Sequence, residues 1–181
     1  KLILLRTHGI TKDPNKMTEN PGPWYHEMRM LGFNYRLSDI HAALGSSQLD
    51  KLESFAQQRR SIVERYNRAF KEIPWLTIPY EKNGVHSVFH LYVLLIDFAQ
   101  INKNRKTVME ELREKGIGTQ VLYIPVHLQP YYRQRFGYNN GDYPNAEKFY
   151  GMTLSIPLYP MMTDDDVDRV ICEILALSGK D

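Results

Sequence analysis

Apolar side chains recur at steps of three and four through residues 39–73, and no proline interrupts the run. This spacing places the apolar side chains on one face, which is typical of an amphipathic helix. A single helix of this length is unusual in a globular protein, so the pattern predicts a short helix and a long helix with a break near Gly45 to Asp50. The apolar positions are Ile40, Ala43, Leu44, Leu49, Leu52, Phe55, Ala56, Ile62, Val63, Tyr66, Ala69, Phe70 and Ile73.

The pattern changes after Pro74, where shorter elements alternate. The prolines around residues 76–79 predict a short edge strand, because proline cannot donate a backbone hydrogen bond to a neighbouring strand. Residues 88–96 are rich in β-branched and aromatic types and predict the strongest strand of the chain. The remaining pattern predicts strands over 118–123 and 154–156 and helices over 103–115, 129–136, 144–152 and from Thr163 to Gly179. This order predicts a small α+β domain with a mostly antiparallel sheet over residues 74–181.

Residues 1–9 predict the tail of a helix that stops at Gly9, because glycine is typical just after a helix end. The next twenty or so residues contain three prolines and Gly22 and predict a long loop. The chain opens on Lys1 inside an apolar run that has no helix cap, so we expect a fragment of a longer protein. Residues 1–73 then form a first region, made of a loop and linking helices.

The composition excludes several classes of protein. The chain has 181 residues, 43% of them hydrophobic, which is enough to bury a core. Its 23 basic and 21 acidic residues are interleaved and its net charge is +2, so nucleic acid is not an expected partner. No apolar run reaches the roughly 20 residues of a membrane-spanning helix, so we expect no membrane partner. One cysteine, Cys172, excludes a disulfide within the chain and favours a reducing compartment such as the cytoplasm.

Common catalytic and metal-binding patterns are missing from the sequence. His86 and His90 are four residues apart in a predicted strand, where the separation is too great for easy sharing of one ion. The sequence contains no Cys-x-x-Cys, His-Glu-x-x-His, P-loop or Gly-x-Ser-x-Gly motif. We therefore expect no metal site and no hydrolase.

A polar turn precedes the predicted short helix. Asn34 and Arg36 lie just before Ser38, which can cap the helix, and Asp39 places a negative charge in the first turn, where the helix dipole favours it. Free backbone N–H groups at a helix start attract anions, so the turn is a candidate ligand site. On spacing alone, the alternative is that Asn34 and Arg36 only satisfy a turn.

A second candidate is the polar and aromatic segment 120–132, which leads from a predicted strand through Pro125 to His127. Such a segment is unusual for a core element. The alternative is that Tyr123 and Tyr131 are half-buried packing residues whose hydroxyl groups reach water.

Several separated motifs resemble the DegT/DnrJ-type sugar aminotransferases, which use pyridoxal phosphate (PLP) to aminate keto sugars attached to a nucleotide. The resemblance is most specific in the branch that aminates a UDP-linked keto-deoxysugar on the pseudaminic acid route. Leu122 departs from a common form of that branch, which has histidine at this position. The motifs are residues 7–14, Pro23-Trp24-Tyr25, residues 32–49, residues 120–132 and Leu154-Ser155-Ile156-Pro157-Leu158.

The resemblance implies a fold-type I PLP transferase of the α/β class. This chain would be the end of its large domain with two linking helices, followed by the small C-terminal α+β domain. Asn34 would reach the cofactor or substrate in the neighbouring subunit's active site, with Arg36 beside it, so a homodimer with shared active sites is implied. The residues expected to line the sugar-nucleotide site are Gln120, Val121, Leu122 and Tyr123, with His127 as a further candidate. The implied amino donor is glutamate.

The resemblance also places the lysine that binds PLP upstream of Lys1, so we expect no catalytic residue in this chain and no activity from it alone. Two alternatives remain open. One is a sibling aminotransferase that acts on another nucleotide keto-sugar. The other is a non-catalytic domain that dimerises or binds a sugar nucleotide. The apolar face beginning near Asp39 needs a cover, so the isolated chain is expected to associate.

Overall fold

The computed structural model describes residues 1–179, which form two compact units, the first over residues 1–51 and the second from Leu52 onward. The boundary lies between helix α2 (Asp39–Leu49) and helix α3 (Leu52–Phe70). The sequence pattern suggested a division at residues 73 and 74. The compact units divide earlier because α3 packs against α7 (Asp164–Ala176) and belongs to the second core.

The first unit begins with α1 (Leu2–Arg6) and contains a small hairpin of β1 (Ile10–Thr11) and β2 (Glu27–Met28). A helix is present here as expected, but it ends at Arg6 with Thr7 as its C-cap, and Gly9 follows two residues later with a positive φ of 72°. The expected long loop is only partly irregular, because its ends pair as the hairpin and it contains a short 3-10 helix, η1 (Pro14–Lys16).

The two helices predicted from residue 39 onward are both present. Ser38 is the N-cap of α2, and its hydroxyl accepts the backbone N–H of His41 at 3.4 Å. No residue of α2 is buried, and Ile40 is 81% exposed. This confirms the expected exposure of its apolar side chains.

The second unit is built on a three-stranded antiparallel sheet with the order β3–β4–β5. The strands are β3 (Leu76–Thr77), β4 (Tyr92–Ile96) and β5 (Thr153–Ile156), and β3 is an edge strand as predicted. Leu94 pairs with Leu154, which fixes the register of the two longer strands. Alternate residues of β4 are fully buried on one face, because side chains in a strand point to opposite sides.

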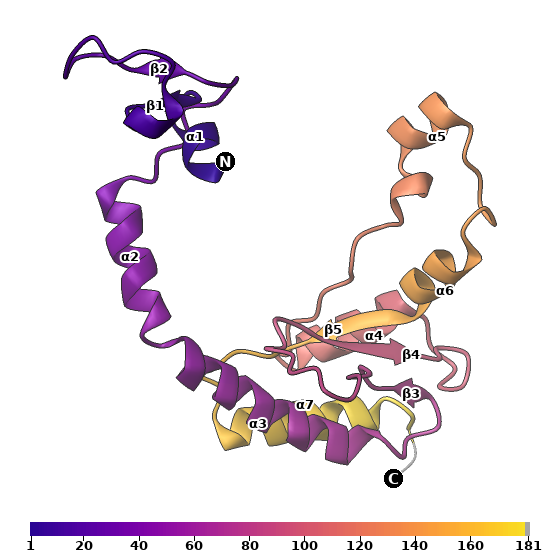
Figure 1. Ribbon diagram of the computed structural model, residues 1–181. Helices are drawn as coiled ribbons and strands as arrows, with labels where there is room; N and C mark the ends of the chain where they lie inside the picture. Colours follow the sequence, from indigo (N-terminus) through magenta and orange to yellow (C-terminus); the bar gives the residue numbers. More distant parts are fainter. Residues whose placement is uncertain (180–181) are drawn as a thin grey trace. The chain divides into compact units, whose positions relative to one another are not determined.

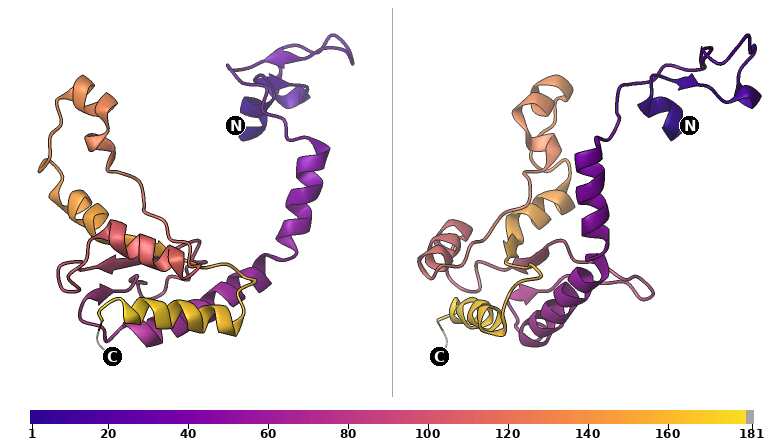
Figure 2. Two further views of the ribbon diagram at one scale, coloured as in Figure 1. Left: turned by 180° about the vertical axis from the view of Figure 1, so that it is seen from behind. Right: turned by 90° about the vertical axis from the view of Figure 1, so that its left-hand side faces the viewer.

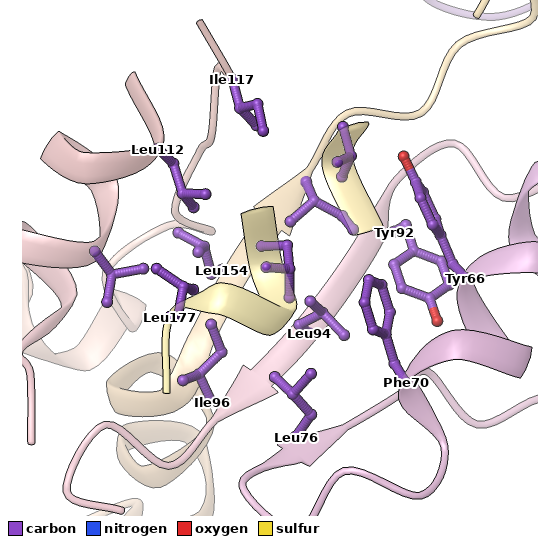
Figure 3. Packing of buried hydrophobic residues seen from close by; sticks show 14 of the residues in the cluster. Tyr66, Phe70, Leu76, Tyr92, Leu94, Ile96, Leu112, Ile117, Leu154 and Leu177 are labelled. Carbon is purple, nitrogen blue, oxygen red and sulfur yellow. The ribbon is translucent and has the colours of Figure 1, made fainter. Parts of the chain in front are cut away.

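Helices α3, α4 (Arg105–Glu114) and α7 supply the side chains that cover this face. Figures 1 and 2 show α3 and α7 side by side, and Figure 3 shows Tyr66 and Phe70 of α3 next to Tyr92 of β4. The hydroxyl group of Tyr66 donates to the carbonyl of Pro157 at 2.9 Å, so its one polar atom is satisfied within the core. The fully buried core side chains include Tyr66, Phe70, Tyr92, Leu94, Ile96, Val108, Leu112, Leu154, Val167 and Ile174.

The last predicted helix is present as α7, and it begins with a capping box. The Thr163 hydroxyl accepts the backbone N–H of Asp166 at 3.2 Å, and the Asp166 carboxylate accepts the backbone N–H of Thr163 at 2.9 Å. The Thr163 N–H and the Thr163 hydroxyl, which donates to the same carboxylate at 2.8 Å, lower the pKa of Asp166. The charged carboxylate therefore stabilises the start of α7 at neutral pH.

Two predicted strands are shorter than expected. The strand expected over residues 88–96 begins only at Tyr92, because Phe89 has a φ of 45° and interrupts the extended backbone. The strand expected over residues 118–123 is reduced to one bridge, in which Gln120 pairs with Ser155. Continued pairing would place residue 118 opposite Pro157, which has no N–H, and residue 122 opposite Thr153, whose N–H already donates to the Phe149 carbonyl at the end of α6.

After Gln120 the chain leaves the sheet and returns to it through α6 (Pro144–Met152). We call residues 121–147 the arm. Figure 1 shows α5 (Pro130–Phe136) at its far end, preceded by the 3-10 helix η2 (Val126–Leu128). Four of the predicted site residues lie in the arm: Val121, Leu122, Tyr123 and His127.

Within residues 1–179, no helix is both long enough and apolar enough to cross a bilayer. The same residues contain no cluster of three or more side chains suited to holding a metal ion.

Candidate functional site

The position of the Asn34 turn is fixed by backbone hydrogen bonds to the end of α1. Phe33 N–H donates to the Leu5 carbonyl at 2.7 Å, and Tyr35 N–H donates to the Arg6 carbonyl at 2.9 Å. Asn34 itself forms an antiparallel bridge with Thr7. The last carbonyls of a helix lack partners within the helix, so this pairing satisfies both segments at once.

Two glycines allow the turn to approach α1 so closely. A Cβ atom on Gly32 would lie 2.3 Å from the backbone nitrogen of Gly9. A Cβ atom on Gly9 would lie 1.7 Å from the Met30 carbonyl oxygen, and its positive φ also favours glycine. Both contacts are with backbone atoms, which cannot rotate away as a side chain can.

The side chains of Asn34 and Arg36 are exposed. Phe33 and Tyr35 stack on each other with ring centroids 5.2 Å apart. Alternate side chains of an extended segment point to opposite sides, so Asn34 and Arg36 share the side away from these rings. Among residues 1–179, neither side chain has a hydrogen-bond or ion-pair partner, which leaves an amide and a guanidinium available to a ligand.

The loop before the turn is held closed by Glu27. One oxygen of its carboxylate accepts the Thr18 N–H and hydroxyl, both at 2.7 Å, and the Glu19 N–H at 2.9 Å. The other oxygen pairs with Arg29 at 2.9 Å. The Thr18 hydrogen bonds contribute most to lowering the pKa of Glu27 to about 2. The loop is thus closed by a carboxylate that is charged at neutral pH.

This closed loop exposes Trp24. Its side chain is 71% exposed, and the ring lies so close to Gly22 that a Cβ there would be 2.4 Å from it. An exposed aromatic face on a fixed loop suits contact with a flat ring or a sugar. Trp24 therefore adds an aromatic candidate to the first unit.

In the second unit, Gln120 is the last residue before the arm that pairs with the sheet. Its N–H donates to the Ser155 carbonyl at 3.0 Å, and the Ser155 N–H donates back at 2.7 Å. Its side-chain oxygen accepts the Val121 N–H at 3.1 Å. Leu122 is half-buried, and Tyr123 is 95% exposed. The segment thus presents a ring and an amide at the base of the arm.

His127 differs from the other predicted site residues because it is buried, with 7% of its surface exposed. Its Nε2 lies 2.9 Å from Oε1 of Glu147. Glu147 also accepts the backbone N–H of Gly141 at 2.8 Å. The hydrogen bond from His127 is the main cause of the lowered pKa of Glu147.

An apolar hollow of about 500 Å³ lies beside His127 in the arm. Aromatic rings dominate its walls, and the His127 and Tyr143 ring centroids are 4.7 Å apart. The hollow is lined by Pro125, Val126, His127, Tyr132, Phe136, Tyr138, Tyr143 and Ala146.

The predicted site residues thus form two groups. Asn34 and Arg36 lie together in the first unit, whereas Gln120, Val121, Leu122, Tyr123 and His127 lie along one segment of the second. Sequence reasoning missed Glu27 and Glu147, which hold the two segments. For Glu147, the only local signal was an acidic residue in the first turn of a proline-started helix.

Comparison with known proteins gives a consistent result. The model of the DegT/DnrJ/EryC1/StrS aminotransferase family matches residues 1–175. The uncharacterized protein MJ1066 of Methanocaldococcus jannaschii is 43% identical over 171 residues, which are 94% of this chain and 44% of that protein. The spore coat polysaccharide biosynthesis protein SpsC of Bacillus subtilis is 41% identical over 172 residues, with the same shares covered.

Two solved structures are also similar. Helicobacter pylori PseC, an aminotransferase involved in the biosynthesis of pseudoaminic acid, matches with a TM-score of 0.81 and 29% identity over 98% of this chain and 45% of that chain. The PLP form of Spr1654 from Streptococcus pneumoniae matches with a TM-score of 0.79 and 27% identity over 98% of this chain and 42% of that chain. The chain therefore spans less than half the length of these relatives.

Replacing Gly32 with alanine is expected to separate the turn from α1, because the new methyl group meets fixed backbone atoms. Hydrogen exchange at the Phe33 and Tyr35 amides should accelerate at least about tenfold, as expected when a buried clash opens a local hydrogen bond. Gly45→Ala is the matched control, since a Cβ there meets nothing within 4 Å. Unchanged exchange in Gly32→Ala would contradict the close approach.

Lowering the pH is expected to open the loop that carries Trp24, but only at pH values well below the ordinary pKa of a glutamate. A carboxylate with a lowered pKa stabilises the fold above its unfolded pKa, and this stability is lost as the pH falls toward the folded pKa of about 2. The Thr18 and Glu19 amide shifts, followed by NMR, should therefore titrate with a midpoint near 2. A midpoint near 4.5, the ordinary pKa, would contradict the clamp, and Glu27→Gln should remove the titration.

Proposed function

This chain belongs to the DegT/DnrJ/EryC1/StrS aminotransferase family, and on that premise we propose that it is the C-terminal part of a PLP-dependent nucleotide-sugar aminotransferase. The complete protein would transfer an amino group from glutamate to the 4-keto carbon of a UDP-linked deoxysugar. The observation that carries the proposal is the family match over residues 1–175. The likeness to PseC supports the choice of substrate.

The cofactor follows from the family, which is PLP-dependent, and Spr1654 has been solved in both PLP and PMP forms. PLP supplies the electron sink that allows the amino group to move. The described residues fit part of such a site, because Asn34 and Arg36 offer a free amide and a free guanidinium suited to phosphate oxygens. We propose that the lysine that binds PLP comes from another part of the complete protein, so that this chain alone is inactive.

Arg36 has the chemistry needed to bind the pyrophosphate of a nucleotide sugar. Its planar guanidinium can donate two parallel hydrogen bonds to phosphate oxygens, and no partner within residues 1–179 competes for it. Asn34 can donate and accept at the same time, which suits a contact with cofactor or sugar. We place both residues in the active site of a neighbouring subunit, in a homodimer with shared sites.

The segment of Gln120, Val121, Leu122 and Tyr123 is the proposed contact for the sugar nucleotide in the second unit. Tyr123 offers an exposed aromatic face and a hydroxyl group, and Gln120 offers an amide. An aromatic face packs on a sugar or a base, whereas the amide can bind hydroxyl groups. His127 is buried against Tyr143 and bonded to Glu147, so we assign it an indirect role.

The exposed apolar side chains of α2 support an assembly in which this helix is covered. A contiguous apolar surface on a soluble protein marks an interaction site. We propose that residues 1–73 are the end of the large domain together with the linking helices, and that residues 74–181 are the small domain. We also propose that the complete enzyme works in the cytoplasm.

The test is turnover by the complete protein. With PLP, glutamate and a UDP-linked 4-keto-deoxysugar, we expect the amino sugar to form, detected by mass spectrometry. Turnover of only a keto-pentose or a dTDP-linked hexose would identify a sibling enzyme. Binding without turnover of any of them would indicate the non-catalytic alternative and contradict the proposal.

Within this assay, Arg36→Ala is expected to raise the KM for the nucleotide sugar about tenfold to a hundredfold, as expected for a lost hydrogen bond to a charged group. Arg36→Lys should recover only part of the loss, because lysine is a point charge without the planar fork. Arg68→Ala, which removes another exposed arginine, is the control and should leave the KM unchanged. An unchanged KM in Arg36→Ala would exclude a contact with the substrate.

A further inference from the structure

Glu147 joins the outgoing and the returning parts of the arm. Its Oε1 lies 2.9 Å from Nε2 of His127, which belongs to the outgoing part of the arm. Its two oxygens accept the Gly141 N–H at 2.8 and 3.0 Å, and Oε1 lies 3.4 Å from the Tyr143 N–H. Gly141 and Tyr143 belong to the returning part. A single carboxylate in the first turn of α6 therefore joins both parts of the arm.

The direction of the His127–Glu147 hydrogen bond follows from the charge of Glu147. Its pKa is lowered by the His127 hydrogen bond and by the Gly141 N–H, so it is a carboxylate at neutral pH. A carboxylate only accepts hydrogen bonds, so Nε2 of His127 carries the proton and donates it. The pair requires a donor at this atom.

Aromatic side chains enclose the ring of His127. Its ring packs against Tyr143, with centroids 4.7 Å apart, and meets Tyr138 edge-on at 6.4 Å. Because 7% of the residue is exposed, the imidazole has little surface left for a ligand. This burial separates its role from that of the exposed Tyr123.

The segment between Gln120 and His127 has few other restraints. Within residues 1–179, the N–H groups of Leu122, Tyr123 and Ile124 have no backbone partner. At one end Gln120 is fixed by its reciprocal hydrogen bonds to Ser155, and at the other His127 is fixed by Glu147. A short segment held at both ends loses less freedom when a ligand binds.

We propose that His127 and Glu147 are a positioning pair that holds the segment around Tyr123 in the shape that binds the nucleotide sugar. This inference rests on the proposed function and assigns His127 a role through Tyr123, without direct contact with the substrate. The pair acts before substrate arrives, so its effect falls mainly on binding.

Three variants of the complete protein test the pair. His127→Phe keeps a flat ring and removes the donor, whereas His127→Gln keeps an N–H at the same number of bonds from the backbone. Glu147→Gln keeps the shape of the side chain but replaces the charged carboxylate, which accepts several hydrogen bonds, with a neutral amide. His86→Gln, at an exposed histidine, is the matched control.

Hydrogen exchange measured without substrate should accelerate about tenfold over residues 121–147 in His127→Phe and Glu147→Gln, while the α7 amides remain unchanged. The KM for the nucleotide sugar should rise about tenfold in the same two variants, with kcat within about twofold. His127→Gln should restore both values toward the wild type.

If His127→Gln and His127→Phe accelerate exchange and raise the KM equally, the proposal is overturned, because hydrogen-bond donation by Nε2 would then be unimportant. Faster exchange with an unchanged KM would also overturn it, since the pair would be purely structural. A complete protein that turns over no nucleotide sugar would refute the proposed function, while the exchange data would still show whether the pair fixes the arm.

Discussion

Two backbone hydrogen bonds, from Phe33 and Tyr35 to the last carbonyls of α1, set the position of the candidate ligand-binding side chains in the first unit. They can form only because Gly9 and Gly32 bring two stretches of backbone closer than any side chain would allow. The pairing uses the main chain alone, so it holds Asn34 and Arg36 in place and leaves their side-chain polar groups free for a ligand. This is the arrangement expected of a binding turn, in which rigid backbone supports free side chains.

The same principle recurs at the two glutamates. Glu27 closes the loop of Trp24, and Glu147 closes the arm, each by accepting several donors on one carboxylate. The hydrogen bonds that lower the pKa of each glutamate also stabilise the closed backbone. Both glutamates are half-buried, and each closed segment carries an exposed aromatic side chain, Trp24 in the loop and Tyr123 in the arm. The candidate surfaces are therefore supported by groups that do not face the ligand.

Much of this architecture was predictable from local sequence. The break between α2 and α3, the edge strand β3 and the capping box of Thr163 and Asp166 follow from periodicity, proline chemistry and capping, which act over a few residues. The reduction of strand 118–123 to one bridge was not predictable, because it depends on Pro157 and Thr153, which lie opposite only in the folded sheet. The burial of His127 likewise depends on Glu147, twenty residues away. The residue types of the candidate site were therefore readable from sequence, whereas their supporting partners required the fold.

The central claim is that Asn34 and Arg36 complete an active site in the neighbouring subunit, and complementation tests it most directly. Two inactive variants of the complete protein are co-expressed, one lacking the lysine that binds PLP and the other carrying Asn34→Ala and Arg36→Ala. If the sites are shared, mixed dimers contain one intact site, and random assortment predicts about a quarter of the wild-type aminotransferase activity. Activity no higher than that of either variant alone would show that both residues act within their own subunit and would contradict the claim.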